Sequence, residues 1–256
     1  FPWDALVFAS TIFRRQGYSE KHPVRALVAP ALSRMRVLHP FFLDNFWHRI
    51  GGVDATLHNF DALVDRPNQA VIVYPEGIEG IGKGFDHRYQ LQRFSNSMIR
   101  MALKYRTDIV PVLTINGEYI NPYGYRVDLI NQIAQQIGIP FVPVGPLTTL
   151  VGLFPWSFYF GLPARLTYVK GRRIRIDELT DQSYEKISQK EMRRLREVVQ
   201  KHFQDELNEA VSNYGNDPYE LDELKELWWE NRDKLAYILP TGWPLLFQEH
   251  ERLFIA

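Results

Sequence analysis

The sequence predicts an α/β fold with a mostly parallel central sheet flanked by helices. Three short apolar runs with little polar alternation are typical of strands buried on both faces: residues 24–30, 69–75 and 108–115. Segments with apolar residues at three- and four-residue spacing precede each of them: residues 5–16, 42–50 and 91–106. This alternation indicates βαβ units and therefore parallel strands.

The length and composition favour one large domain with an extension. A chain of 256 residues with 45% apolar residues can bury a sizeable core. We expect the α/β domain to cover residues 1–180 and a helical extension, packed on it, to cover residues 181–256. Ser188 and Glu191 form a capping box that begins the first helix of the extension, and Asp217 precedes a second helix.

The charge balance and the absence of cysteine exclude several functions. Equal numbers of basic and acidic residues, 30 of each, give no global field of the kind that nucleic-acid binding proteins use. With no cysteine, disulfides, thiolate nucleophiles and zinc-thiolate sites are excluded. We therefore expect any charged ligand to be bound by a local cluster, and we expect no nucleic-acid partner.

Residues 129–164 carry no charge, but their prolines and glycines exclude a membrane-spanning helix. We expect loops and short strands there, with most aromatic side chains in the core. Trp156, Phe158, Tyr159 and Phe160 are also suited to a bilayer surface. Residues 164–176, "ARLTYVKGRRIRI", predict two strands around Lys170 and Gly171, with arginines that guard an edge strand or contact anionic lipid.

The stretch "VIVYPEGIEGIGKGFDHR", residues 71–88, follows a strand and contains four glycines. Gly77, Gly82 and Lys83 match the spacing G-x-x-x-x-G-K of a nucleotide-binding P-loop. Gly84 stands where a P-loop needs a hydroxyl for magnesium and the start of a helix, and Glu76 would repel phosphate. Nucleotide binding is therefore an alternative that the local chemistry disfavours.

Three motifs resemble a known family. "VYPEGIEG", then "LQRF", then "IVPVLTING" resemble the third and fourth motifs of the glycerol-phosphate and lysophospholipid acyltransferases, particularly their monoacylglycerol acyltransferase-like branch. "FPWDALVF" is similar to the second half of the family's first motif, His-x4-Asp, with Asp4 as the acid. The matching histidine would lie two residues before Phe1. The resemblance covers about residues 1–176.

A second His-x4-Asp pair, His39 and Asp44, has the same spacing. On a helix, five residues leave the two side chains roughly 140° apart, and Pro40 makes His39 a helix-start residue. The family also places its first and third motifs farther apart than His39 and Pro75. We therefore assign the motif to Asp4.

The resemblance implies a reaction and its residues. A histidine base would take the proton of an acceptor hydroxyl as the oxygen attacks a thioester, and Asp4 would orient that histidine. The substrate-binding residues implied are a corner that holds the acceptor and one residue of the site wall: Tyr74, Pro75, Glu76, Gly77 and Pro111. The cations able to meet phosphates of an acyl donor or a headgroup are Lys83, Arg88 and Arg93.

The predicted function is therefore acyl transfer in lipid metabolism, from acyl-CoA or acyl carrier protein to a glycerolipid hydroxyl. We expect no metal or organic cofactor, and peripheral association with the cytoplasmic face of a membrane. Residues 51–59 carry Leu57, His58 and Asn59 where the family often has a phosphate-binding arginine, so a neutral acceptor is as plausible as lysophosphatidic acid. A non-catalytic protein that binds lipid or acyl-CoA is the main alternative.

Overall fold

A parallel three-stranded sheet, in the order β2–β1–β3, organises the N-terminal half of the chain. The structure is a computed structural model that describes residues 3–17, 19, 23–33, 46–136, 138–154, 157 and 160–234. The strands of this sheet are β1 (Val24–Val28), β2 (Val53–Asp54) and β3 (Ala70–Ile72). Helices lie between them in sequence, and the predicted α/β class with a parallel sheet is confirmed.

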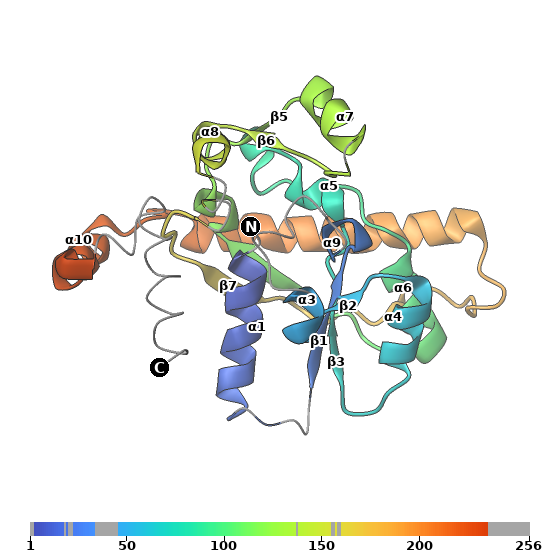
Figure 1. Ribbon diagram of the computed structural model, residues 1–256. Helices are drawn as coiled ribbons and strands as arrows, with labels where there is room; N and C mark the ends of the chain where they lie inside the picture. The colour runs from blue at the N-terminus through green and yellow to red at the C-terminus, as the bar shows by residue number, and fades with distance from the viewer. Residues whose placement is uncertain are drawn as a thin grey trace, which may run out of the picture.

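Helices surround the sheet and dominate the C-terminal half (Figure 1). Those of the first half are α1 (Trp3–Arg15), α2 (Pro30–Ser33), α3 (Phe46–Arg49), α4 (Leu57–Val64), α5 (Ile78–Ile81) and α6 (Ser97–Tyr105). Those of the second half are α7 (Asp128–Gln136), α8 (Pro146–Leu153), α9 (Gln189–Tyr214) and α10 (Leu221–Glu230). Short 3-10 turns connect some of them: η2 (Phe85–His87), η3 (Gly117–Ile120), η5 (Ile176–Glu178) and η6 (Arg232–Lys234).

Two antiparallel pairs complete the strands: β4 (Val112–Ile115) with β7 (Thr167–Lys170), and β5 (Tyr125–Arg126) with β6 (Pro143–Val144). The predicted strand at 108–115 is therefore shorter than expected, and it pairs antiparallel with β7. Pro111 has no N–H to donate, so the ladder stops there and only an isolated bridge, Ile109 to Ile174, continues it. The expected strand after Gly171 is reduced to that bridge.

One large core joins α6, β4 and α9. Ile99, Ile115, Leu195 and Val199 are fully buried in it. A second cluster packs Leu27 of β1 and Met101 of α6 against α4. The helical segment after residue 180 thus contributes to the main core through α9, which packs against α6 and β4.

The ends of α9 follow from its sequence. The Ser188 hydroxyl accepts a hydrogen bond from the Glu191 N–H at 3.1 Å, which is one half of the predicted capping box; the Ser188 N–H donates to Gln182 Oε1 at 3.0 Å instead of to Glu191. The C-cap of the helix is Gly215. In Figure 1 this helix (orange) runs across the width of the molecule and α10 lies at one side. No helix in the described part of the chain combines the length and the apolar character needed to cross a bilayer.

The segment from β5 to α8 projects on one side, at the top of Figure 1, next to α5. We call residues 123–153 the upper arm. Its base contacts the glycine-rich stretch: the Phe85 N–H donates to the Gly124 carbonyl at 2.8 Å, and the Phe85 and Tyr123 rings lie 5.2 Å apart. The arm therefore lies beside the part of the chain in which the sequence predicts the site.

Candidate functional site

Asp4 lies in the first turn of α1, against the junction of β4 and η3. The Tyr168 hydroxyl of β7 donates to the Asp4 main-chain carbonyl at 2.7 Å. A Cβ added at Gly117 would lie only 3.7 Å from Oδ2 of Asp4. Burial raises the pKa of the Asp4 carboxyl, the Ala5 N–H lowers it, and Glu118 raises it further. The predicted orienting acid is thus partly buried and close to a second acid.

The corner after β3 places Glu76. The Gly77 N–H donates to the Tyr74 carbonyl at 3.0 Å, and Gly77 takes a left-handed φ of 61° that favours glycine. The Glu76 side chain then folds over Gly80, where a Cβ would come within 2.7 Å of the Glu76 Cβ. Gly80 therefore makes room for the carboxylate of Glu76, which is a packing reason for one of the four glycines.

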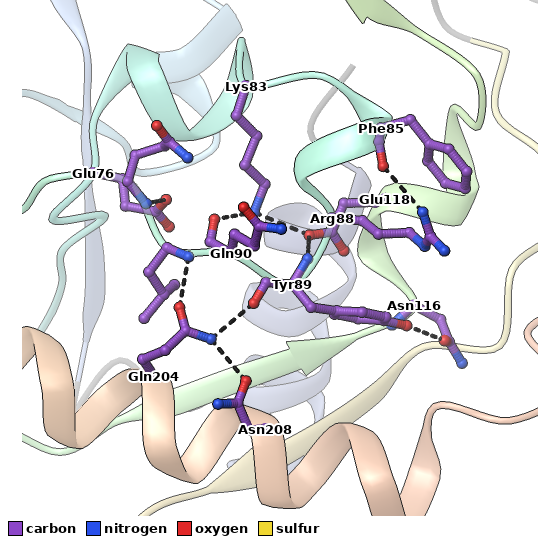
Figure 2. Close-up of polar contacts among 12 residues, drawn as sticks. Glu76, Lys83, Phe85, Arg88, Tyr89, Gln90, Asn116, Glu118, Gln204 and Asn208 are labelled. Atoms are coloured by element: carbon purple, nitrogen blue, oxygen red, sulfur yellow. Dashed lines mark hydrogen bonds and ion pairs between the residues drawn. The ribbon is translucent and has the colours of Figure 1, made fainter.

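A loop, residues 89–96, fixes this corner from the other side. The Gln92 N–H donates to Oε2 of Glu76 at 2.5 Å, and the Ser95 N–H donates to the Pro75 carbonyl at 2.8 Å. The loop is itself bound to α9, because Gln204 accepts from the Leu91 N–H at 2.8 Å (Figure 2). The long C-terminal helix thus supports the loop that orients Glu76.

Glu118 connects the two predicted halves of the site. It follows Gly117 at the end of β4, and its Oε1 lies 3.1 Å from Nζ of Lys83 and accepts from the Tyr89 N–H at 3.0 Å (Figure 2). Sequence reasoning missed this residue. The available signal was an acid directly after a strand, in "TINGEYI", since functional side chains often follow strand ends.

Electrostatic effects show that Asp4 and the corner share one region. Burial raises the pKa of Tyr74, and the charge of Asp4 raises it further. Burial also raises the pKa of Glu76, which the Gln92 hydrogen bond and Lys83 lower and Glu118 raises. Asp4 acts on Tyr74, and Glu118 acts on both Asp4 and Glu76. Asp4 therefore lies within electrostatic range of Tyr74, and Glu118 lies within range of both Asp4 and Glu76.

The three predicted cations do not form one cluster. Lys83 is 11% exposed, and its charge is taken by Glu118 and by the Gln90 carbonyl at 3.1 Å. Arg88 places its guanidinium 5.0 Å from the centre of the Phe85 ring. Arg93 is exposed, and its side chain makes no hydrogen bond or ion pair with the described residues. Only Arg88 and Arg93 therefore remain open to a phosphate.

Pro111 lies elsewhere. It stands just before β4, at the end of the strand opposite to Glu118, and is fully buried. Its carbonyl accepts from the Gly171 N–H at 3.0 Å, and its Cβ would lie 2.9 Å from a Cβ at Gly171. That Pro111 shapes the wall of the site stays a prediction; in the fold it limits the β4–β7 ladder.

The remaining sequence-based alternatives have these positions. After Lys83 the chain forms the 3-10 turn η2, and the next α-helix begins only at Ser97, so the local fold differs from a P-loop. His58 lines a surface hollow with Arg100 and Lys104 between α4 and α6. His39 and Asp44 lie outside the described residues, as do the aromatic positions 156, 158 and 159.

The site is rich in acid, which gives a pH dependence of stability. Asp4 and Glu76 have ordinary pKa values of 3.8 and 4.5, and both are raised in the folded chain. As the pH rises, the unfolded chain loses these protons at a lower pH than the folded chain does. The stabilisation that the two carboxyl groups contribute is therefore full below about pH 4 and is lost as the pH rises through their raised pKa values.

We expect Glu76→Gln to reduce this loss, because the amide oxygen still accepts from Gln92 and carries no charge to bury. The measurement is the unfolding temperature at about pH 5 and about pH 8. Glu79→Gln, an exposed acid of the same segment, is the matched control and should behave as the parent does. If the unfolding temperature fell equally in Glu76→Gln and in the parent between these two pH values, the burial of this carboxylate would be contradicted.

Comparisons with known proteins find only uncharacterized relatives. Uncharacterized proteins of Mycobacterium bovis and of Mycobacterium tuberculosis (strain H37Rv) are each 40% identical over 99 residues, 36% of this chain and 27% of each relative. An uncharacterized protein of Mycobacterium leprae is 39% identical over 103 residues, 37% of this chain and 27% of the relative. The matches thus span about a quarter of the length of these relatives. No family model matches the sequence, and no solved structure matches it.

Proposed function

We propose that this chain transfers an acyl group from acyl-CoA or acyl carrier protein to a hydroxyl of an uncharged glycerolipid at a membrane surface. The observation that supports the proposal is that Asp4 lies within electrostatic range of Tyr74, beside the corner of Glu76, and that Glu118 acts on both Asp4 and Glu76. Asp4 and the corner of Glu76 are the first-motif acid and the third motif of the acyltransferases that the sequence resembles.

The reaction needs a base and two substrates. The acceptor oxygen bonds to the thioester carbonyl carbon, the C–S bond breaks, and the hydroxyl proton passes through the base to the leaving thiolate. In this proposal the base is a histidine two positions before Phe1, and Asp4 orients it, as the acid of a Ser-His-Asp triad orients its histidine. The acceptor's own hydroxyl is the nucleophile, so no acyl-enzyme forms.

Glu76 supports acceptor binding through its free oxygen. Its Oε2 is held by the Gln92 N–H, whereas Oε1 accepts no hydrogen bond from the described residues. A carboxylate that is held at one oxygen can accept a hydrogen bond from a substrate hydroxyl at its other oxygen, in a defined direction. We assign Glu76 to a second hydroxyl of the glycerol, so that the reacting hydroxyl is oriented by its neighbour.

The charge of the site supports an acceptor without phosphate. Glu118 acts on both Asp4 and Glu76, and Lys83, which acts on Glu76, is already paired with Glu118. A phosphate beside this set would meet like charge in a partly buried place. Residues 51–59 also lack the arginine that would bind it. Mono- or diacylglycerol-like acceptors therefore suit the site better than lysophosphatidic acid.

The test uses the chain extended at its N-terminus by His and one further residue, against the same extension with Ala in place of His. Thiol release from acyl-CoA is measured with monoacylglycerol, with lysophosphatidic acid and without acceptor. We expect the histidine form to be roughly 10²- to 10⁴-fold faster, with monoacylglycerol preferred. Equal rates of the two forms would exclude this histidine as the base. A preference for lysophosphatidic acid would contradict the proposal that the acceptor is uncharged.

A further inference from the structure

Helix α7 turns its apolar residues outward. Leu129 is 67% exposed and Ile133 is 57% exposed, whereas the buried residues of the same helix are Asn131 and Ala134. Leu129 and Ile133 lie one turn apart on one face of the helix. This reverses the usual pattern of a surface helix, in which the apolar face meets the core and the polar face meets water.

The inward face explains the orientation of the helix. The Asn131 side-chain carbonyl accepts from the Val142 N–H at 2.7 Å, which ties α7 to the chain before β6. A buried amide is stabilised only while it is bonded, so this contact fixes which side of the helix faces in. The outward apolar face is therefore a defined feature of the fold.

Further exposed side chains lie at the base of the upper arm, next to the glycine-rich stretch. Tyr123 contacts Phe85, and the Tyr125 backbone lies beside Gly84. A Cβ at Gly82 would lie 3.3 Å from Cγ of Phe141, so the arm packs closely on the end of α5. Ile81, the last residue of α5, is also exposed. We call the exposed residues of this surface the α7 face: Ile81, Tyr123, Tyr125, Leu129, Ile130 and Ile133.

The chemistry of the α7 face suits a lipid bilayer. Its outer part is aliphatic, its inner part carries tyrosines, and the chain has no charge from residue 129 to residue 164. At its edge Arg126 is paired with Asp128 at 2.9 Å, so these two charges partly neutralise each other. Aliphatic side chains flanked by tyrosines match the hydrocarbon and headgroup levels of a membrane interface.

We infer that the α7 face docks on a phospholipid bilayer and holds the corner of Glu76 at the lipid surface. This inference rests on the proposed function, because a glycerolipid acceptor must come from the bilayer and the α7 face adjoins the corner that would receive it. Helix α10 is the competing surface. It exposes Leu221, Leu227, Trp228 and Trp229, but it also carries four acids and one lysine, which anionic lipid disfavours.

The absence of native cysteine allows a direct test. Single cysteines replace Ile133 on α7, Leu227 on α10 and Leu57 on α4, all exposed, and each carries a polarity-sensitive dye. Vesicles of phosphatidylcholine and phosphatidylglycerol are then added. We expect a blue shift at position 133 and none at positions 227 and 57. A shift at position 227 without one at position 133 would overturn the inference.

Charge substitutions give the second measurement. Leu129→Glu with Ile133→Glu should lower vesicle binding in sedimentation roughly tenfold or more, since two aliphatic side chains would no longer enter the lipid. The matched pair Leu221→Glu with Leu227→Glu on α10 should leave binding unchanged. Equal loss in both pairs, or a parent that forms dimers through the α7 face and ignores vesicles, would contradict docking on lipid.

Neither readout involves acyl transfer, so the two proposals fail separately. If the dye at position 133 enters lipid but the histidine-extended chain releases no thiol, docking stands and the reaction falls. If thiol is released with detergent-dispersed acceptor but the dye shows no shift, the reaction stands and the docking surface falls.

Discussion

Replacing Asp4 with Asn is expected to lower acyl transfer by roughly 10²- to 10⁴-fold in the chain extended with the histidine. Asparagine keeps the size and the first-turn position of the side chain but loses the charge that would orient and stabilise a protonated imidazole. The measurement is thiol release at saturating acyl-CoA, followed across pH, because a lost orienting acid should also lower the pKa of the histidine seen in the rate.

Stability separates this role from a structural one. Burial raises the pKa of Asp4, so a neutral amide removes a buried charge and should leave the unfolding temperature at neutral pH no lower than that of the parent. Asp222→Asn changes an exposed acid in the first turn of α10 and should alter neither rate nor stability. Unchanged activity of Asp4→Asn, with or without a change in stability, would contradict the proposed mechanism.

Replacing Leu195 with Ala is expected to lower the free energy of unfolding by about 2 to 5 kcal/mol. Leu195 is 0% exposed and packs in the core that contains Ile99 and Ile115, so truncation leaves a cavity between α9, α6 and β4. In a chain of this size each kcal/mol corresponds to about 2 to 4 °C in unfolding temperature. Thermal and urea unfolding, followed by circular dichroism, measure the loss.

Val198 provides the control on the same helix. It is 38% exposed, and Val198→Ala should change the free energy of unfolding by less than about 0.5 kcal/mol. We also expect one cooperative transition for the parent, because α9 shares its core with the strands. Two separate transitions, with only the smaller one shifted by Leu195→Ala, would contradict this shared core.

Local patterns in the sequence predicted several of the elements, but the loops and short strands expected over residues 129–164 were wrong in part, because α7 and α8 lie there. Strands β1 and β3 lie inside the apolar runs predicted for them, and the Ser188 hydroxyl caps α9 as its spacing with Glu191 indicates. These features depend on neighbouring residues and can be predicted locally. The antiparallel partner of β4 could not, because β7 is more than fifty residues away and nothing local selects it.

The site was predicted in part for a similar reason. The resemblance placed Asp4 beside the corner of Glu76, but it gave no reason to expect Glu118 as the partner of Lys83. That pairing depends on how the end of β4 meets the stretch after α5, which is a tertiary fact. Lys83 was therefore expected to be free to bind phosphate. Pro111 was assigned to the site from the order of the motifs alone; in the fold it lies at the end of β4 opposite to Glu118.

Two glycines allow the upper arm to pack closely against the stretch after α5. A methyl group at position 82 would lie 3.3 Å from Cγ of Phe141. A methyl group at position 84 would lie 3.2 Å from the main-chain nitrogen of Arg126, and the φ of Gly84 is 86°, which favours glycine. The close packing of the upper arm on this stretch thus depends on two glycines. A side chain at either position would push the arm outward without replacing any acid of the candidate site.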